Sequence, residues 1–293
     1  MLWLNGGLRR RPRRAATTTA AVALAALALL AGSGRTSADE ASDTFALSAM
    51  DKTHLAYVIT GDAQVDETSR AGLAGLSDEL AARTALEPGD PIGVDPSKDE
   101  LAFFPLIYWP IVPTVAAPPP ATMAKIDAYM RQGGSVLFDT RDQLERSISV
   151  NTFSGTPAAD RLREMLSSLD VPPLEPVPAD HVLTKAFYLL NDFPGRYAGG
   201  PLWVQTTDTS DERSDRPAQA GDGVSTILIT ENDFAGAWAV DADRTFLYPT
   251  VPSDPMQREM AYRTGINIVM YTLTGNYKAD QVHVPALLER LGQ

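Results

Sequence analysis

The feature that most constrains this chain is an alternation of short apolar runs with segments of helical periodicity. Strands are predicted in five runs, which are "HLAYVIT", "LAFFPLIYW", "SVLFDT", "PLWVQT" and "STILIT". The continuous apolarity of Val136 to Phe138 is typical of a parallel strand that is covered on both faces. Strands that alternate with helices indicate a mainly parallel, three-layer α/β domain.

Helices are predicted between these runs. Leu73, Leu76 and Leu80 share one face of a helix for which Thr68 or Ser69 would supply the cap. The stretches "ATMAKIDAYMRQGG" and "TPAADRLREML" carry apolar stripes and end or begin with cap residues, so each predicts a further helix.

The C-terminal part is predicted as two helices. "SDPMQREMAYRTGINIVMYTLTGN" would end at Gly275 and Asn276, and "PALLERLGQ" would form a separate short helix. Three other stretches are predicted to be connections: "EPGDPIGVDPSKDE", "DVPPLEPVPAD" and the polar segment from Thr207 to Gly223. The last is expected to be a mobile surface loop.

The N-terminal residues predict an exported protein. Five arginines fall between Arg9 and Arg14, an apolar run from Ala20 to Ala31 follows, and small residues precede Asp39. This is the order of a secretory signal, and the run is shorter than the ~20 residues that span a bilayer. We expect a signal peptide at 1–38, a tether at 39–53 and one domain at 54–293. Export to the periplasm would use the Sec or the twin-arginine route, and an uncleaved signal would anchor the protein in the membrane.

Composition excludes several classes of function. The formal net charge is −12, and loss of residues 1–38, which hold six of the 25 Lys and Arg and none of the 37 Asp and Glu, would make it −18. Such a domain repels nucleic acid and anionic lipid. The chain has no cysteine, which excludes disulfides and a cysteine nucleophile. His54, His181 and His283 are isolated and no phosphate-binding glycine loop occurs, so neither a metal nor a cofactor is expected.

The sharpest candidate site is "GGSVLFDTRD", in which polar residues follow a buried strand. Parallel sheets bind ligands beyond the carboxyl ends of their strands. Asp139 would serve there as a base or a ligand, with Thr140 and Arg141 beside it. The alternative is structural: Asp139 caps the next segment, and Arg141 pairs with Asp142 at the surface.

A second predicted strand ends in "ENDFAGAW". Asn232 and Asp233 suit hydrogen bonding to a polar ligand, and Trp238 would offer a stacking face for a sugar or a base. The same Asn and Asp equally suit a plain Asx turn.

The stretch from His181 to Val204 is rich in aromatic residues and glycine. Because Phe187 and Leu190 lie at helical spacing, we expect Phe187, Tyr188 and Leu190 to anchor the stretch in the core. The turn formers that come next would present a polar loop at the mouth of the sheet.

The turn of this stretch would present Asp192, Arg196 and Tyr197 at the mouth of the sheet, and we expect Arg196 and Tyr197 to bind a ligand. His181 would act with Asp192 in catalysis under one hypothesis, with His181 as acid, Asp139 or Asp192 as base and Arg196 as a clamp. Under the other hypothesis His181 is a structural histidine.

Six stretches, taken in order, resemble an uncharacterised bacterial family, a domain of unknown function. They are "LAYVITGD", "DELAFFPLIYWP", "GGSVLFDTRD", "HVLTKAFYLLNDFPGRYAGG", "ILITENDFAGAW" and "YRTGINIVMYTLTGNYKADQVHVPALLERL". The resemblance covers about His54 to Leu291. In many members this domain ends a long membrane protein that begins with an aerotolerance-regulator-like region, whereas this chain has a signal-like segment in that place.

The family is similar to the class I glutamine-amidotransferase-like superfamily, which implies a flavodoxin-like fold. In the catalytic members a cysteine stands on a sharp turn after a central strand. "GGSVLFDT" looks like that strand, with Asp139 or Thr140 at the position of the cysteine. The resemblance therefore implies the fold without the amidotransferase reaction.

The trehalose-utilisation-like branch of the superfamily also lacks the cysteine. Its histidine-led pattern is similar to "HVLT...FYLLNDFPGRY", although Val182 stands where the branch has a proline. This similarity implies that one cleft holds Asp139, His181, Asp192 and Arg196.

Three functions are compatible with the sequence. The first is a binding domain for a small polar ligand or a protein partner, without a catalytic nucleophile. The second is a hydrolase or isomerase acting on a sugar-like substrate. The third is a structural component of a membrane-associated complex, which an exposed apolar patch around "FPLIYWPIVP" would favour.

Overall fold

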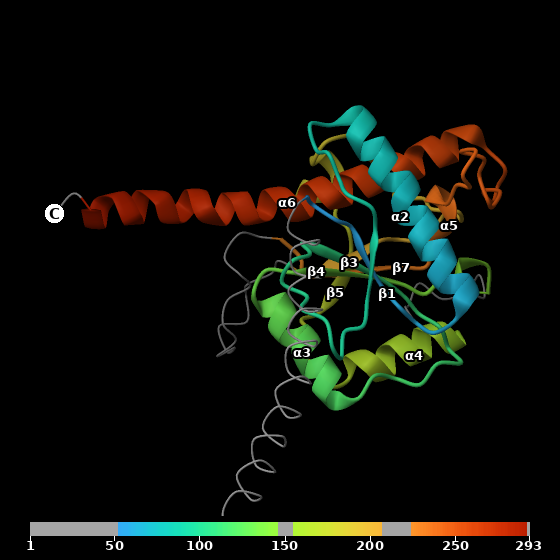
Figure 1. Ribbon diagram of the computed structural model, residues 1–293, viewed down its shortest axis with the longest axis horizontal. Coiled ribbons are helices and arrows are strands. Elements are labelled where there is room, and N and C mark those ends of the chain that lie inside the picture. The colour runs from blue at the N-terminus through green and yellow to red at the C-terminus, as the bar shows by residue number, and fades with distance from the viewer. Residues whose placement is uncertain (1–51, 146–154, 207–223, 292–293) are drawn as a thin grey trace, which may run out of the picture. The chain divides into compact units, whose positions relative to one another are not determined.

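The computed structural model describes residues 52–145, 155–206 and 224–291, with side chains up to residue 274 (Figure 1). The predicted signal peptide, most of the predicted tether and the predicted loop from Thr207 to Gly223 lie outside these residues. All of the candidate site residues predicted from the sequence lie within them.

One seven-stranded sheet runs through the domain, in the order β2-β1-β3-β4-β7-β6-β5 (Figure 1). The strands are β1 (Ala56–Val58), β2 (Ile92–Val94), β3 (Leu106–Pro110), β4 (Ser135–Asp139), β5 (Leu174–Pro176), β6 (Trp203–Gln205) and β7 (Ile227–Thr230). The pairings among β2, β1, β3, β4 and β7 are parallel, while β6 is antiparallel to both β7 and β5. The predicted α/β class with a mainly parallel sheet is confirmed.

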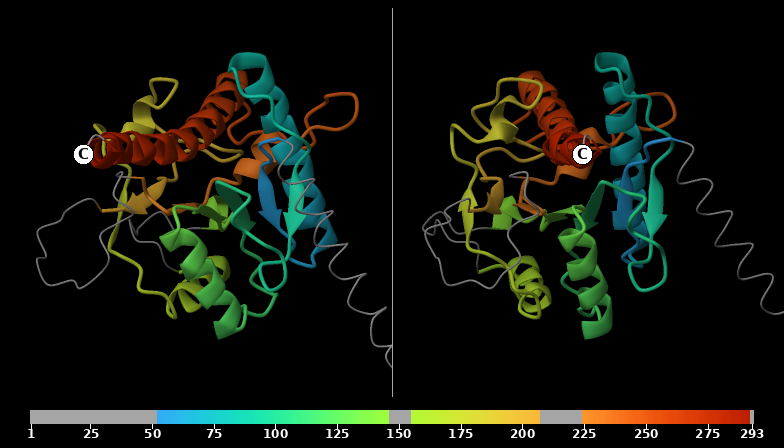
Figure 2. Two further views of the ribbon diagram at one scale, coloured as in Figure 1. Left: turned by 60° about the vertical axis from the view of Figure 1, so that its left-hand side comes forward. Right: turned by 90° about the vertical axis from the view of Figure 1, so that its left-hand side faces the viewer.

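Helices cover both faces of the sheet (Figure 2). The helices are α2 (Ala63–Arg83), α3 (Pro120–Arg131), α4 (Pro157–Leu166), α5 (Phe234–Trp238) and α6 (Pro255–Leu291), with short 3-10 turns η1 (Gln143–Glu145) and η2 (Val182–Lys185). One layer consists of α2, α5 and α6, which pack on one another. The other layer consists of α3 and α4. The central strands are buried along their whole length because both layers cover them.

The layer of α2, α5 and α6 packs closely where its residues are small. Gly72 of α2 faces α5, and a Cβ atom there would lie 2.4 Å from the Ala235 carbonyl oxygen. Trp238, the last residue of α5, is buried and donates from its indole nitrogen to the Ala261 carbonyl of α6 at 2.8 Å. A side chain larger than hydrogen at position 72 would therefore push α2 away from the core.

Two helix boundaries differ from the prediction. α2 begins earlier than expected, because the side chain of Asp62 accepts hydrogen bonds from the Gln64 and Val65 amides and caps the helix there. α6 continues through Gly275 to residue 291 instead of ending and restarting. A glycine inside a helix costs only about 1 kcal/mol and does not force an end.

The two edge strands were expected to be connections. β2 and β5 have three residues each, and both lie in proline-rich stretches. Proline lowers strand propensity in a sequence, but an edge strand tolerates it because one side of its backbone needs no partner. The short, proline-flanked edges also limit pairing with other chains.

Candidate functional site

Asp139 is the last residue of β4, and its carboxylate has no exposed surface. The Tyr108 hydroxyl and the Phe234 amide donate to one carboxylate oxygen, at 2.9 and 2.7 Å. The Arg141 and Asp233 amides donate to the other oxygen, at 3.0 and 3.3 Å. These four donors match the four lone-pair positions of a carboxylate. A ligand in solvent would not reach this group.

Burial raises the pKa of Asp139 from its ordinary value of 3.8 to about 7. The neighbouring carboxylate of Asp233 acts in the same direction, because two negative charges close together disfavour ionisation. The hydrogen bond from the Phe234 amide and the charge of Arg141 oppose this rise. Asp139 is thus a buried titratable group at the end of a central strand.

The residues after β4 fix the turn that leads toward α4. The Thr140 hydroxyl donates to Asp142 at 2.5 Å, and Thr156, the N-cap of α4, donates to the other oxygen of Asp142. Arg141 has a left-handed φ of 58°, and its guanidinium donates to the Ile111 carbonyl at 3.0 Å. The expected pairing of Arg141 with Asp142 is replaced by this contact, because two hydroxyl groups already occupy the aspartate.

Asn232 and Asp233 connect β7 to α5. Asp233 has a φ of 53° and caps α5 by accepting from the Gly236 amide at 3.2 Å. The Asn232 side chain is buried and donates to the carbonyls of Phe193 and Gly200, at 2.9 and 2.8 Å. Both side chains therefore hold the loop from Phe193 to Gly200 and the start of α5 in place.

Arg196 and Tyr197 are attached to this same connection. Arg196 forms an ion pair with Asp233 at 3.3 Å, and its amide donates to the Asp233 carbonyl at 3.2 Å. The Tyr197 amide donates to the Asn232 carbonyl at 3.0 Å. The Arg196 guanidinium also lies 5.3 Å from the ring centroid of Tyr197 and 4.9 Å from that of Tyr248. These contacts extend the buried cluster to the surface.

His181 lies toward the other end of the sheet. Its ring centroid is 5.6 Å from that of Tyr271, whose hydroxyl accepts from the Ser225 amide just before β7. Thr230, which pairs with the last residue of β4, is the final residue of β7. At about 3.3 Å per residue, Ser225 and Thr230 are about 16 Å apart along the strand. His181 caps η2 by accepting from the Leu183 amide, and burial lowers its pKa.

The structure thus brings together only some of the predicted site residues. Asp192 is exposed, and His181 is remote, so the expected cleft that combines both with Asp139 and Arg196 is absent from the described residues. We call the connected set the Asp139 network; its members are Tyr108, Asp139, Arg141, Arg196 and Asp233.

Two aromatic residues differ in burial from what the sequence predicts. Trp238 is buried in the core, so its ring offers no stacking face to a ligand in solvent. Phe187 is 43% exposed, whereas Leu190 and Phe193 are buried. The expectation that Phe187 belongs to the core is wrong, because the residues around it are not helical and the i, i+3 spacing does not apply to them.

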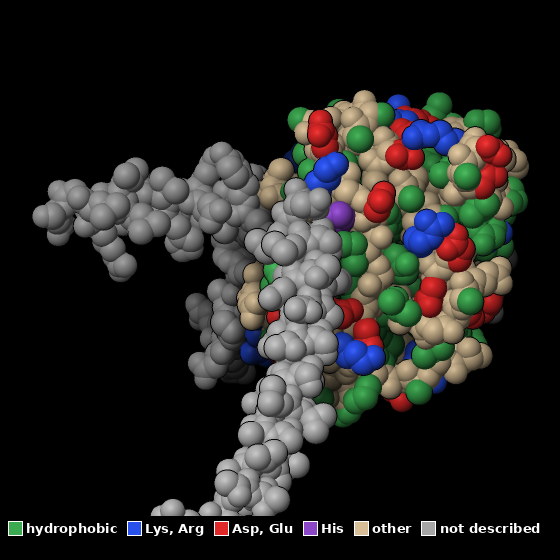
Figure 3. All heavy atoms as spheres, in the orientation of Figure 1, with side chains coloured by type: hydrophobic (Ala, Val, Ile, Leu, Met, Phe, Trp, Pro, Cys, Tyr) green, Lys and Arg blue, Asp and Glu red, His purple; other side chains and the backbone are tan. Residues whose placement is uncertain are grey.

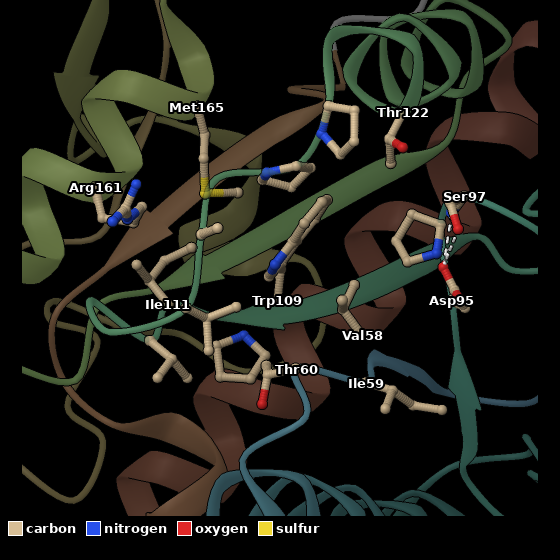
Figure 4. A pocket seen from close by; sticks show the side chains of 17 residues that line it. Val58, Ile59, Thr60, Asp95, Ser97, Trp109, Ile111, Thr122, Arg161 and Met165 are labelled. Atoms are coloured by element: carbon tan, nitrogen blue, oxygen red, sulfur yellow. Dashed lines mark hydrogen bonds between the residues drawn. The ribbon is translucent and has the colours of Figure 1, made fainter.

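An open cavity of about 200 Å³ lies beside this network, at the carboxyl ends of β1, β2 and β3 (Figure 4). Trp109 of β3 forms its floor. One side is lined by Ile111, which follows β3, and by Met165 of α4. Ile59 and Val115 at its rim are 50% and 37% exposed. We call this cavity the β1–β3 crevice.

The crevice lies where the strand order reverses. The chain passes from β1 outward to β2 and then returns to the opposite side of β1 to form β3. Helical connections on opposite faces of such a sheet leave a space at this point, and ligands bind there in many open α/β sheets. Strand order was not predicted from the sequence. The one feature of the sequence that could have indicated the crevice is the apolar stretch "FPLIYWPIVP", which supplies its floor and one wall.

The wall formed by the β3–α3 connection is fixed by two arginines. Arg141 donates to the Ile111 carbonyl at 3.0 Å, and Arg161 of α4 donates to the Pro113 carbonyl at 3.2 Å. Both carbonyls lie in a proline-rich segment with few backbone donors of its own. The crevice is therefore a preformed cavity.

Metal-binding clusters and membrane spans are both absent from the described residues. In that part of the chain, His, Asp and Glu nowhere form a group of three that could hold a metal ion. No described helix combines the length and the apolarity needed to cross a membrane. Acidic and basic side chains are interspersed on the face shown in Figure 3.

The comparison with known proteins gives a family and no function. No curated protein matches the chain. The family model of a domain of unknown function, DUF4159, matches residues 54–273, which include all seven strands, the Asp139 network and the β1–β3 crevice. The chain belongs to the DUF4159 family.

Proposed function

We propose that this domain is an exported, amidotransferase-like binding module without a catalytic nucleophile, and that it recognises a protein partner at the β1–β3 crevice. The observation that carries the proposal is the contrast in access. The crevice has Trp109 as its floor and opens to solvent at the exposed rim residues Ile59 and Val115, whereas the carboxylate of Asp139 has no exposed surface. The placement outside the cytoplasm rests on the arginine cluster and the apolar run before Asp39.

The size of the crevice favours a single apolar side chain as its occupant. Pockets for drug-sized ligands measure about 300–1,000 Å³, while an apolar cavity of about 150 Å³ accommodates benzene. A volume of about 200 Å³ therefore suits a leucine or phenylalanine side chain. Apolar anchors that enter such pockets dominate the energetics of many protein interfaces.

Small amides test this proposal directly. N-acetyl-leucinamide, N-acetyl-phenylalaninamide and N-acetyl-glycinamide would be titrated into the full chain while the methyl NMR signals of Ile59 and Val115 are recorded. We expect saturable shifts with the first two amides only. Ala116 lines the crevice, so Ala116→Phe should remove the response.

The matched control is Ala124→Phe, at an exposed position of α3 that does not line the crevice. This variant should bind as the wild type does. Equal binding of the glycine amide, or undiminished binding by Ala116→Phe, would contradict the proposal.

A second candidate is a hydrolase or isomerase acting on a sugar-like substrate at the Asp139 network. The observation that favours it is the raised pKa of Asp139, about 7, which suits a general acid or base at neutral pH. Such a reaction would require α5 and the loop from Phe193 to Gly200 to move away. Turnover of 4-nitrophenyl glycosides that Asp139→Asn abolishes and Ala116→Phe leaves intact would favour this candidate.

A further inference from the structure

We infer that the segment bound at the β1–β3 crevice is basic as well as apolar: an extended stretch of a partner protein whose aliphatic or aromatic side chain enters the cavity between flanking lysine or arginine residues. This inference rests on the proposed function, because it names the partner of the same site. The charges around the crevice support it.

The segment after β1, which includes the start of α2, and the loop after β2 lie on one side of the crevice and are acidic. Residues 59–70 and 95–102 hold six carboxylates and two basic side chains, a net charge of −4. The carboxylates are Asp62, Asp66, Glu67, Asp95, Asp99 and Glu100. The two basic residues are already paired, Arg70 with Glu67 at 2.6 Å and Lys98 with Asp95 at 2.8 Å.

Several of these carboxylates hold their loops through neutral donors, which leaves their charge in place. Asp66 accepts from the Thr60 and Gly61 amides, and Asp62 accepts from the first amides of α2. Asp99 accepts from the Asp95 amide at 2.7 Å. An amide donor satisfies a carboxylate without neutralising it, so these groups still attract a cation.

Asp95 connects the acidic side to the cavity, because it is one of the residues that line it. Hydrogen bonds from Lys98 and Ser97 lower its pKa to about 2, so it is ionised at neutral pH. The Lys98 side chain is 79% exposed. An ion pair that is so open to water contributes little stability, so a lysine or arginine of the partner can replace Lys98.

The remaining sides of the crevice present little free charge. The β3–α3 connection from 111 to 119 has no charged side chain. Arg161 also lines the cavity, but it donates to the Pro113 carbonyl and pairs with Glu164 at 2.6 Å. Lys125 of α3 also lies at the acidic side and donates to the Asp99 carbonyl at 2.5 Å, so the net charge there is −3 when it is counted. An acidic partner segment would therefore meet net repulsion from the segments after β1 and β2.

The cavity volume favours an extended segment over a helix. A helix that binds in a groove inserts a row of anchors at positions i, i+3 or i+4 and i+7, which needs a long apolar groove. A cavity of about 200 Å³ holds one anchor. In an extended chain the neighbouring residues follow at about 3.3 Å each, which keeps their side chains near the anchor and the acidic loops.

Tripeptides separate the two parts of this inference. Acetyl-Lys-Leu-Lys-amide, acetyl-Glu-Leu-Glu-amide and acetyl-Lys-Gly-Lys-amide would be titrated into the full chain at about 20 mM and at about 500 mM NaCl. At low salt we expect the lysine–leucine peptide to bind about tenfold more tightly than the glutamate–leucine peptide. At high salt the difference should fall below about twofold, because exposed charges are screened.

Two substitutions locate the charge effect. Asp62→Asn with Asp95→Asn keeps an oxygen acceptor at both turns, since asparagine caps helices and forms Asx turns as aspartate does. This double variant should lose about fivefold in affinity for the lysine–leucine peptide. The control is Asp78→Asn, sixteen positions along α2 from Asp62 and thus about 24 Å away, which should bind unchanged.

The outcomes distinguish the inference from the proposed function. If both leucine peptides bind equally and the glycine peptide does not bind, the basic partner is overturned and the apolar anchor stands. If the glycine peptide binds as tightly as the leucine peptides, the proposed function fails. Dimerisation that depends on concentration and is lost in Ala116→Phe would show a second copy as the occupant and would also overturn the inference.

Discussion

The ends of β4 and β7 and the ends of β1 and β3 lie at the same edge of one sheet, yet the first pair is polar and covered while the second is apolar and open. At the first pair, Asp139 would be the obvious choice for chemistry by residue type alone. At the second pair, Trp109, Ile111 and Val115 would pass for ordinary core. Access reverses this order, because the crevice opens to solvent at Ile59 and Val115, whereas the carboxylate of Asp139 has no exposed surface.

The difference arises from the element that comes after each strand. α5 begins directly after β7, and its capping residue Asp233 and first residue Phe234 donate amides to Asp139. The loop from Phe193 to Gly200 then bonds to Asn232 and covers the same end. After β3 the chain instead leaves as a proline-rich segment, which forms one wall of the open crevice. Chemistry at a strand end thus depends on the next element along the chain.

The largest expected effect is a pH dependence of stability that originates in Asp139. Its pKa is about 7 in the folded protein and 3.8 ordinarily, so the folded state binds more protons between these values. Its contribution to stability is therefore fully present below about pH 4 and is lost as the pH rises through 7. Relative to Asp139→Asn, the free energy of unfolding should fall by about 4 kcal/mol from about pH 4 to about pH 8.

Urea melts of both proteins across this pH range measure the difference, which removes the titration of groups that do not interact with Asp139. The control is Asp127→Asn on α3, where the carboxylate is partly exposed and pairs with Arg131. A wild-type advantage that grows with pH would show that the four hydrogen-bond donors outweigh burial and hold Asp139 ionised. The Asp139 network would then be a fixed charge instead of a titrating one.

Much of the fold could be predicted from the sequence because its central elements carry strong local signals. The apolar run of β4, the threonine cap and proline start of α4 and the stripe of α3 each follow from residue type and spacing. The edge strands and α5 could not be predicted in the same way. β2 and β5 are three residues long and rely on their neighbours for stability, and α5 is a five-residue helix fixed by a left-handed Asp233.

The candidate site was harder to predict, because it depends on strand order. The sequence placed Asp139, Arg196 and Asn232 at strand ends or turns, and the structure connects them through Asp233. It could not show that His181 lies toward the opposite end of β7, since that position depends on how the long loop after β5 crosses α6. The crevice lies at the reversal between β1 and β3, which no local pattern encodes.

An intermediate effect is expected for Arg196, which joins the Asp139 network to the surface. Arg196→Ala removes an ion pair to the nearly buried Asp233 and two aromatic contacts, so the free energy of unfolding should fall by about 2 kcal/mol. Arg70→Ala, which removes an exposed pair with Glu67, should cost less than about 0.5 kcal/mol. Denaturant melts give both values.

The same Arg196 variant also tests whether the two sites are independent. Because its contacts are to Asp233, Tyr197, Tyr248 and Pro249, none of which lines the crevice, N-acetyl-leucinamide should bind Arg196→Ala within about twofold of the wild type. A large loss of binding in a variant that remains folded would show that the network shapes the crevice, and the contrast between the two sites would no longer hold.

The smallest expected effect on stability comes from the rim of the crevice, and a matched pair of isoleucines shows it. Ile59 follows β1 and is 50% exposed, whereas Ile107 of β3 pairs with the same strand and is fully buried. Ile59→Ala should cost less than about 1 kcal/mol, since little apolar surface leaves the core, while Ile107→Ala should cost about 2–5 kcal/mol because it leaves a cavity. The effect on binding should be the reverse of the effect on stability. Ile59→Ala should lower the affinity for N-acetyl-leucinamide severalfold, because it removes a wall of the cavity at little cost to the fold. If Ile59→Ala instead destabilises the protein as much as Ile107→Ala and leaves the amide affinity unchanged, then Ile59 belongs to the core, and the crevice is a packing defect rather than a site.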